Sequence, residues 1–139
     1  MVHALKEAWR VLLPHGTMID VRPLSVVVPL EVVDETGCQV AGEVDNTPDL
    51  KYDIAADQAI DVVIEEGIFA QSSYENFDYV YYWKTYHGMI VDFKERWEGE
   101  IIVAQDVLDK ARRLYKQRYP HARLRLPMRM MLGKYEKQG

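Results

Sequence analysis

Residues 4–21, which read ALKEAWRVLLPHGTMIDV, predict a helix, a tight turn and a strand in direct succession. Four apolar side chains in the first part recur at helical spacing: Leu5, Ala8, Trp9 and Leu12. Residues 3–13 are therefore expected to form a helix with one apolar side. Pro14 and Gly16 end it, because proline disfavours helical backbone in the preceding residue and glycine permits positive φ. Residues 17–22 then follow as a predicted strand.

Outward from that stretch, apolar patterning predicts further elements and an α+β fold. Strands are predicted at residues 30–34, 38–44, 74–84 and 122–132, and helices at residues 54–66, 88–97 and 104–119. We expect Asp53 to be the N-cap of the first of these helices, Pro127 to place the last strand at a sheet edge or bulge, and the polar tail after Gly133 to be frayed. The expected architecture is a mixed sheet with an antiparallel C-terminal hairpin and helices packed on it, in one domain over residues 1–139.

The composition is that of an ordinary globular domain. The chain has 139 residues, of which 48% are hydrophobic and 28% charged, close to the usual averages. Its formal net charge of −5 argues against non-specific nucleic-acid binding. The one cysteine, Cys38, cannot form an intrachain disulfide, and no apolar run has the length of a membrane span. Both observations favour a cytoplasmic location, with Cys38 as a small strand residue rather than a nucleophile.

The opening stretch resembles a late segment of class I (type 11-like) S-adenosylmethionine-dependent methyltransferases. In that family a helix reading roughly ea.RvLkPGG runs into the fifth strand of a doubly wound sheet. The residues that match are Glu7, Ala8, Arg10, Val11, Leu12, Pro14 and Gly16. His15 stands where the family usually has glycine. A helix, an aromatic strand, further helices and a closing strand follow in the family, and residues 74–84 and 122–132 would supply its closing antiparallel hairpin.

A cofactor-binding half is not recognisable in these residues. In the family a glycine-rich turn lets the backbone approach the methionine part of the cofactor, and an acidic residue after the second strand holds the ribose hydroxyls. The glycines here are scattered, at positions 16, 37, 42, 67, 88, 99, 133 and 139, and no G-x-G-x-G pattern occurs. The resemblance thus implies the C-terminal part of a methyltransferase that binds no cofactor alone. S-adenosylmethionine would bind only if a partner supplies the missing half.

Candidate substrate-facing residues come from two segments. The resemblance places Asp20 and Arg22 at the carboxyl end of the family's fifth strand, a region that faces the substrate, but the motif carries no catalytic residue across. The aromatic segment could form a second wall, because tyrosine presents an apolar body and a polar tip. Packing in the core is the alternative. The candidates in this segment are Tyr79, Tyr82, Trp83 and Tyr86.

Arginines on one face of the last predicted strand are candidate anion ligands, since guanidinium groups pair with carboxylates and phosphates. They are Arg123, Arg125 and Arg129. Acidic partners across the sheet, such as Asp78, would explain them without a ligand. No two of the four histidines are spaced i, i+4 and no cysteine pair occurs, so no metal site is predicted.

Three classes of function remain open. The first is a methyltransferase-like domain, inactive alone, that contributes the substrate-side part of an S-adenosylmethionine-dependent methyltransferase. The second is a non-enzymatic dimerising relic or interaction module. The third is a small-molecule-binding α+β protein with a pocket walled by the aromatic strand. The sequence identifies neither a substrate nor a catalytic residue.

The strand at residues 17–22 predicts assembly, because a strand suited to the middle of a sheet would otherwise present unpaired amide and carbonyl groups. We expect a second copy, the commoner arrangement in soluble proteins, or a separate cofactor-binding polypeptide to cover it. Light scattering at micromolar protein concentration is expected to report an oligomer. A monomer would count strongly against this hypothesis.

Overall fold

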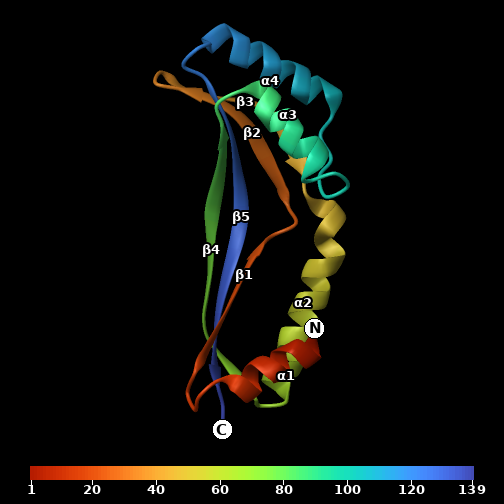
Figure 1. Cartoon of the computed structure of the whole chain (residues 1–139), viewed down its shortest axis with the longest axis vertical. Coiled ribbons are helices and arrows are strands. Elements are labelled where there is room, and N and C mark those ends of the chain that lie inside the picture. Colours follow the sequence, from red (N-terminus) through yellow and green to blue (C-terminus); the bar gives the residue numbers. More distant parts are fainter. The chain divides into compact units, whose positions relative to one another are not determined.

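The computed structural model describes residues Met1–Gly139, and its elements follow the order helix, three strands, helix, strand, two helices, strand (Figure 1). They are α1 (Val2–Val11), β1 (Thr17–Pro23), β2 (Val27–Asp34), β3 (Gly37–Asp45), a 3-10 turn (Thr47–Asp49), α2 (Leu50–Glu65), β4 (Phe69–Trp83), α3 (Tyr86–Glu95), α4 (Gln105–Arg118) and β5 (Arg123–Lys137). The expected α+β class is confirmed.

β5 is the central strand of the sheet and pairs with three other strands. The order is β1-β5-β2-β3, and β4 pairs with β5 as well, which confirms the predicted pairing of the aromatic strand with the last strand. β5 uses Met130–Glu136 to pair with β1 and Arg123–Arg125 to pair with β2. The sheet is antiparallel, whereas a mixed sheet was expected.

The chain divides into two compact units made of alternating segments. Unit 1 comprises Met1–Leu24, Leu50–Phe77 and Met130–Gly139, and unit 2 comprises Ser25–Asp49 and Asp78–Arg129. β4 and β5 contribute residues to both. Each unit has its own apolar core, and each is described by itself below.

In unit 1, α1 and α2 pack together over a small core. The buried residues are Ile60, Val63, Phe69 and Tyr135, and the apolar side of α1 packs against them. Gly133 makes room for the Tyr135 ring, because a Cβ at this position would lie 2.5 Å from the tyrosine hydroxyl. The apolar side of α1 thus packs against the core, as the sequence predicts.

β1 lies at the edge of the sheet, with β5 on one side and no strand on the other. Its side chains alternate between half-buried and exposed. Met18 packs against the unit 1 core, whereas Ile19 and Val21, on the opposite face, are 60% and 49% exposed. An exposed apolar strand with a free hydrogen-bonding edge is unusual, since proteins normally protect such edges.

The C-terminal segment is ordered, and the expectation of a frayed tail after Gly133 is wrong. The ammonium group of Lys137 donates a hydrogen bond to the Leu12 carbonyl at 2.7 Å and lies 4.5 Å from the centre of the Trp9 ring. The Trp9 indole in turn donates to the Gln138 carbonyl. A cation at the C-terminal end of α1 also complements the helix dipole. β5 extends to Lys137, the residue that makes these contacts.

Unit 2 contains the β2–β3 hairpin, parts of β4 and β5, and the helices α3 and α4. Buried apolar side chains from all of these elements form its core, including Leu30, Val44, Phe93 and Leu124. α4 packs closely on β3, where a Cβ on Gly42 would lie 2.5 Å from a Val107 methyl group. None of the helices in the chain combines the length and apolar character needed to cross a membrane.

Two further boundary expectations are corrected. α2 begins at Leu50 after the 3-10 turn, so Asp53 lies in its first turn and is not the N-cap. The side chain of Asp45 instead accepts a hydrogen bond from the Thr47 amide and starts the helical stretch earlier. Of the two positions expected for Pro127, an edge strand or a bulge, the edge strand is wrong, because β5 is interior. Pro127 falls between the segments of β5 that pair with β2 and with β1, where a residue without an N–H group is tolerated.

Replacing Lys137 with methionine is expected to lower the free energy of unfolding by about 1–2 kcal/mol, because the Leu12 carbonyl loses a charged donor. Lys134→Met, on the opposite face of β5, is the matched control and should cost less than about 0.5 kcal/mol. Urea unfolding measures both changes. Equal effects of the two substitutions would contradict the anchoring role of Lys137.

Candidate functional site

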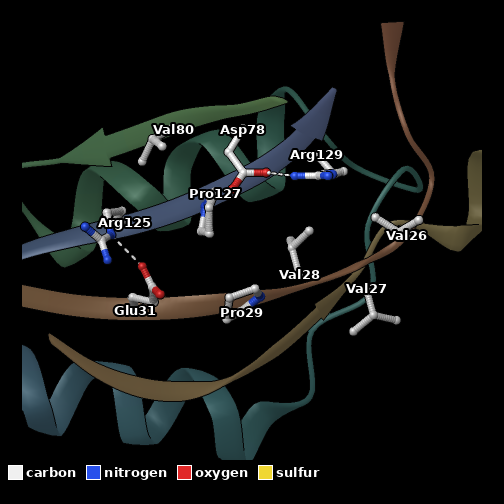
Figure 2. A pocket seen from close by; sticks show the side chains of 10 residues that line it. All are labelled: Val26, Val27, Val28, Pro29, Glu31, Asp78, Val80, Arg125, Pro127 and Arg129. Carbon is white, nitrogen blue, oxygen red and sulfur yellow. Dashed lines mark hydrogen bonds and ion pairs between the residues drawn. The ribbon is translucent and has the colours of Figure 1, made fainter. Parts of the chain in front are cut away.

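An open hollow of about 560 Å³ lies in unit 2, on the sheet face away from α3 and α4 (Figure 2). Alternation along β5 separates the two faces: Leu124 and Leu126 are in the core, whereas Arg125 and Pro127 line the hollow. The full lining is Val26, Val27, Val28, Pro29, Glu31, Asp78, Val80, Arg125, Pro127 and Arg129. The wall is therefore mainly valine and proline, with four charged side chains.

The hollow forms where β2 and β5 part. These strands pair only from Glu31 to Val33 on β2, and a register shift between Leu30 and Glu31 interrupts the β2–β3 ladder at the same place. Pro29 on β2 and Pro127 on β5 lie beyond the paired region, on either side of the hollow (Figure 2). Because proline has no N–H group, neither residue can donate a ladder hydrogen bond across the gap.

Two arginine–carboxylate pairs are part of the wall, and they differ in burial. Arg125 pairs with Glu31 across the β2–β5 ladder, and their side chains are 32% and 13% exposed. Hydrogen bonds to Glu31 and Tyr82 raise the pKa of Arg125 above its usual value, against the opposing effect of burial. Arg129 pairs with Asp78 at 3.1 Å, and these side chains are 45% and 51% exposed. The Arg125–Glu31 pair is thus mostly buried and further bonded to Tyr82, whereas the Arg129–Asp78 pair is about half exposed to solvent.

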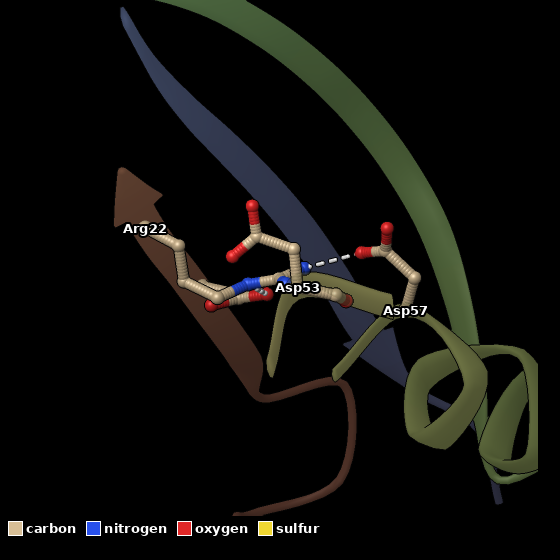
Figure 3. Close-up of polar contacts among 4 residues, drawn as sticks. Arg22, Asp53 and Asp57 are labelled. Carbon is tan, nitrogen blue, oxygen red and sulfur yellow. Dashed lines mark hydrogen bonds and ion pairs between the residues drawn. The ribbon is translucent and has the colours of Figure 1, made fainter. Parts of the chain in front are cut away.

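A second polar cluster lies in unit 1, at the carboxyl end of β1 (Figure 3). Arg22 bonds Asp20 at 2.8 Å and Asp57 of α2 at 2.7 Å, and it also donates to the Asp53 carbonyl at 3.4 Å. Burial alone would lower the pKa of Arg22, but the hydrogen bond to Asp57 and the neighbouring Asp20 raise it overall. The guanidinium is thus held permanently charged between two carboxylates.

Tyr135 lies near this cluster. Burial raises the pKa of its phenol above the usual value, and the negative charge of Asp20 adds to the effect. Arg22 is paired with both Asp20 and Asp57 within this polar network. This arrangement joins β1 to α2 and leaves Arg22 with its charge already paired.

The aromatic candidates are placed in different environments. Trp83 is buried in the unit 2 core, where its indole donates to Asp92 at 2.7 Å. Tyr86, at the start of α3, is half-buried, and burial raises the pKa of its phenol. Tyr79 and Tyr82 are exposed on opposite faces of β4. These four residues do not line the hollow; β4 contributes Asp78 and Val80 to it instead.

The arginine candidates are also separated by the structure. Arg125 and Arg129 line the hollow, whereas Arg123 does not and donates to the neighbouring Ala122 carbonyl. Asp78 is the acidic partner of Arg129, as the sequence suggested. No group of three or more histidine, cysteine, aspartate or glutamate side chains is arranged to hold a metal ion.

Sequence reasoning missed the β2 side of the hollow, which consists of Val26–Pro29 and Glu31. The available signal was a proline in each of two apolar strands, Pro29 and Pro127, because paired strands that both lack a donor are expected to separate. Comparisons with protein-family models, with curated proteins and with solved structures find no match to this chain.

The two ion pairs should differ in their contribution to stability. Glu31→Gln is expected to lower the free energy of unfolding by about 1–3 kcal/mol, because it leaves the partly buried Arg125 without its charged partner. Asp78→Asn breaks an exposed pair and should cost less than about 1 kcal/mol. Urea unfolding of the two variants tests the difference. A larger loss for Asp78→Asn than for Glu31→Gln would contradict the stronger stabilising role of the Arg125–Glu31 pair.

Proposed function

We propose that this chain is a methyltransferase-like domain that contributes the substrate-side part of an S-adenosylmethionine-dependent methyltransferase, with a partner polypeptide supplying the cofactor-binding half. The observation that carries the proposal is β1. It follows α1 and the Pro14-His15-Gly16 turn, pairs on one side only, and exposes Ile19 and Val21. An incomplete sheet of this kind is what the C-terminal part of a doubly wound sheet would present.

The order of the remaining elements supports the same interpretation. After β1 and the inserted β2–β3 hairpin come α2, the aromatic strand β4, two helices and β5, and β4 pairs with β5. His15 has φ 61°, a left-handed conformation, at the position where the family usually has glycine. The backbone here therefore adopts the conformation that glycine favours, even though the residue differs.

The position of unit 2 along the chain supports a role on the substrate side. The β2–β3 hairpin follows the carboxyl end of β1, and α3 and α4 follow the carboxyl end of β4. Ligands of open α/β sheets bind outside the carboxyl ends of the strands. Asp20 and Arg22 also lie near that end of β1, and their network with α2 would fix its geometry.

The residues of this chain do not fit the cofactor by themselves. Four glycines have open space beside them, but they lie in separate places in the chain: Gly37, Gly67, Gly99 and Gly139. No backbone cradle for the methionine part of the cofactor can be assembled from them. In this role the chain binds and orients the methyl acceptor.

A fusion protein tests the proposal. The cofactor-binding half of a class I methyltransferase, ending after its fourth strand, is joined ahead of Met1. We expect the fusion to bind S-adenosylmethionine by calorimetry, whereas this chain alone and the joined half alone do not, because the added strand completes the sheet beside β1. Hydrogen exchange at the amides of Thr17–Pro23 should slow in the fusion, since more of them are bonded.

Lysine substitutions at similarly exposed positions on β1 and β4 test whether the exposed face of β1 is required. Ile19→Lys with Val21→Lys places charges on the open face of β1 and should abolish cofactor binding in the fusion, whereas Tyr79→Lys on β4 should leave it unchanged. A folded fusion without cofactor binding and without slower exchange on β1 would refute the proposal. The same result with a tight homodimer through β1 would favour the dimerising module instead.

A further inference from the structure

The charge of the unit 2 hollow restricts the ligands that fit it. Two guanidinium groups and two carboxylates line it, so its formal charge is zero. A phosphate or sulfate would meet two carboxylates as well as two arginines, and the hollow offers no uncompensated positive charge. A ligand that carries both signs of charge matches this wall better than a simple anion does.

Only one of the two pairs is free to accept a ligand. Arg125 is held by Glu31 and Tyr82, and it also lies 3.7 Å from the Cys38 sulfur. The single protein partner of Arg129 is Asp78, through one guanidinium nitrogen and one carboxylate oxygen. Four of the five N–H donors of Arg129 and the second oxygen of Asp78 are thus left for other partners. An exposed ion pair contributes little to stability, so small shifts of either side chain cost little.

The rest of the wall is apolar and lies beside the Arg129–Asp78 pair. Val26, Val27, Pro29, Val80 and Pro127 line the hollow, and Figure 2 shows the Arg129–Asp78 pair near Pro127 on the same face of the sheet. Burial of an aliphatic group against such side chains is favourable in proportion to the apolar area removed from water. The volume of about 560 Å³ lies in the range of small-molecule sites.

We propose that this hollow binds an α-amino acid with an apolar side chain. The ligand's carboxylate accepts hydrogen bonds from Arg129, its ammonium group donates to Asp78, and its side chain packs on the valines and prolines. Adjacent ligand charges of opposite sign match the adjacent, oppositely charged side chains of the Arg129–Asp78 pair. All residues involved belong to unit 2, so the inference does not rest on the proposed methyltransferase role.

The experiment compares three ligands of one shape on the full 139-residue chain. Backbone amide shifts are titrated by NMR with L-leucine, with 4-methylpentanoate, which lacks the ammonium group, and with 3-methylbutylamine, which lacks the carboxylate. We expect L-leucine to bind at least about tenfold more tightly than either analogue, with the shifts centred on Val80 and Val27. Arg129→Gln and Asp78→Asn should each weaken leucine binding by about tenfold or more.

Arg123→Gln is the matched control, because Arg123 lies on the same strand face but outside the hollow, and it should bind leucine as the parent does. Dispersed amide spectra establish that each variant is folded. Three outcomes would overturn the proposal. They are no shifts with leucine up to about 10 mM, equal binding of leucine and 4-methylpentanoate, which would indicate a simple anion site, or unchanged binding in both folded hollow variants.

Discussion

The hydrogen bonding of β5 to three other strands is the constraint on which the rest of the structure depends. β1, β2 and β4 all pair with this strand, and β3 joins the sheet only through β2. Each unit also takes core residues from β5: Leu124 and Leu126 in unit 2, and Tyr135 in unit 1. Without β5, the sheet would keep only the pairing of β2 with β3. The bond from Lys137 to the Leu12 carbonyl anchors the C-terminal end of β5 to α1.

The same strand explains why the hollow lies where it does. β5 is too long for β2 alone, so one part pairs with β2 and another with β1, and a stretch around Pro127 has neither as a partner. Alternation then sends the apolar side chains of this stretch to the helices and the charged ones to the opposite face. The ion pairs at the hollow are thus a consequence of strand geometry, and their unequal burial follows from the presence or absence of a β2 neighbour.

The same strand order leaves β1 at an edge of the sheet. β1 has a partner on one side only, and its outer face carries apolar residues that nothing in this chain covers. In unit 1 the polar network of Arg22, Asp20 and Asp57 fixes β1 to α2 but adds no partner for the open edge. β1 is therefore fixed to α2 and β5, and its other edge is free to pair with a further strand. This combination is the physical basis of the proposed role as one part of a larger sheet.

The sequence by itself determined the type and order of the main elements, because helical and alternating spacing are local properties of residues such as Leu5, Ala8 and Trp9. It also identified Asp78 as an acidic partner for the arginines of the last strand. It did not determine that Lys137 is anchored, that Trp83 is buried while Tyr79 is exposed, or that Pro127 lies in an interior strand. Those facts depend on which strand lies beside which, and on contacts between residues more than a hundred positions apart, such as Lys137 and Leu12. Only the tertiary structure brings Glu31 to Arg125 and parts β2 from β5, since pairing register is a property of two strands together and of neither alone.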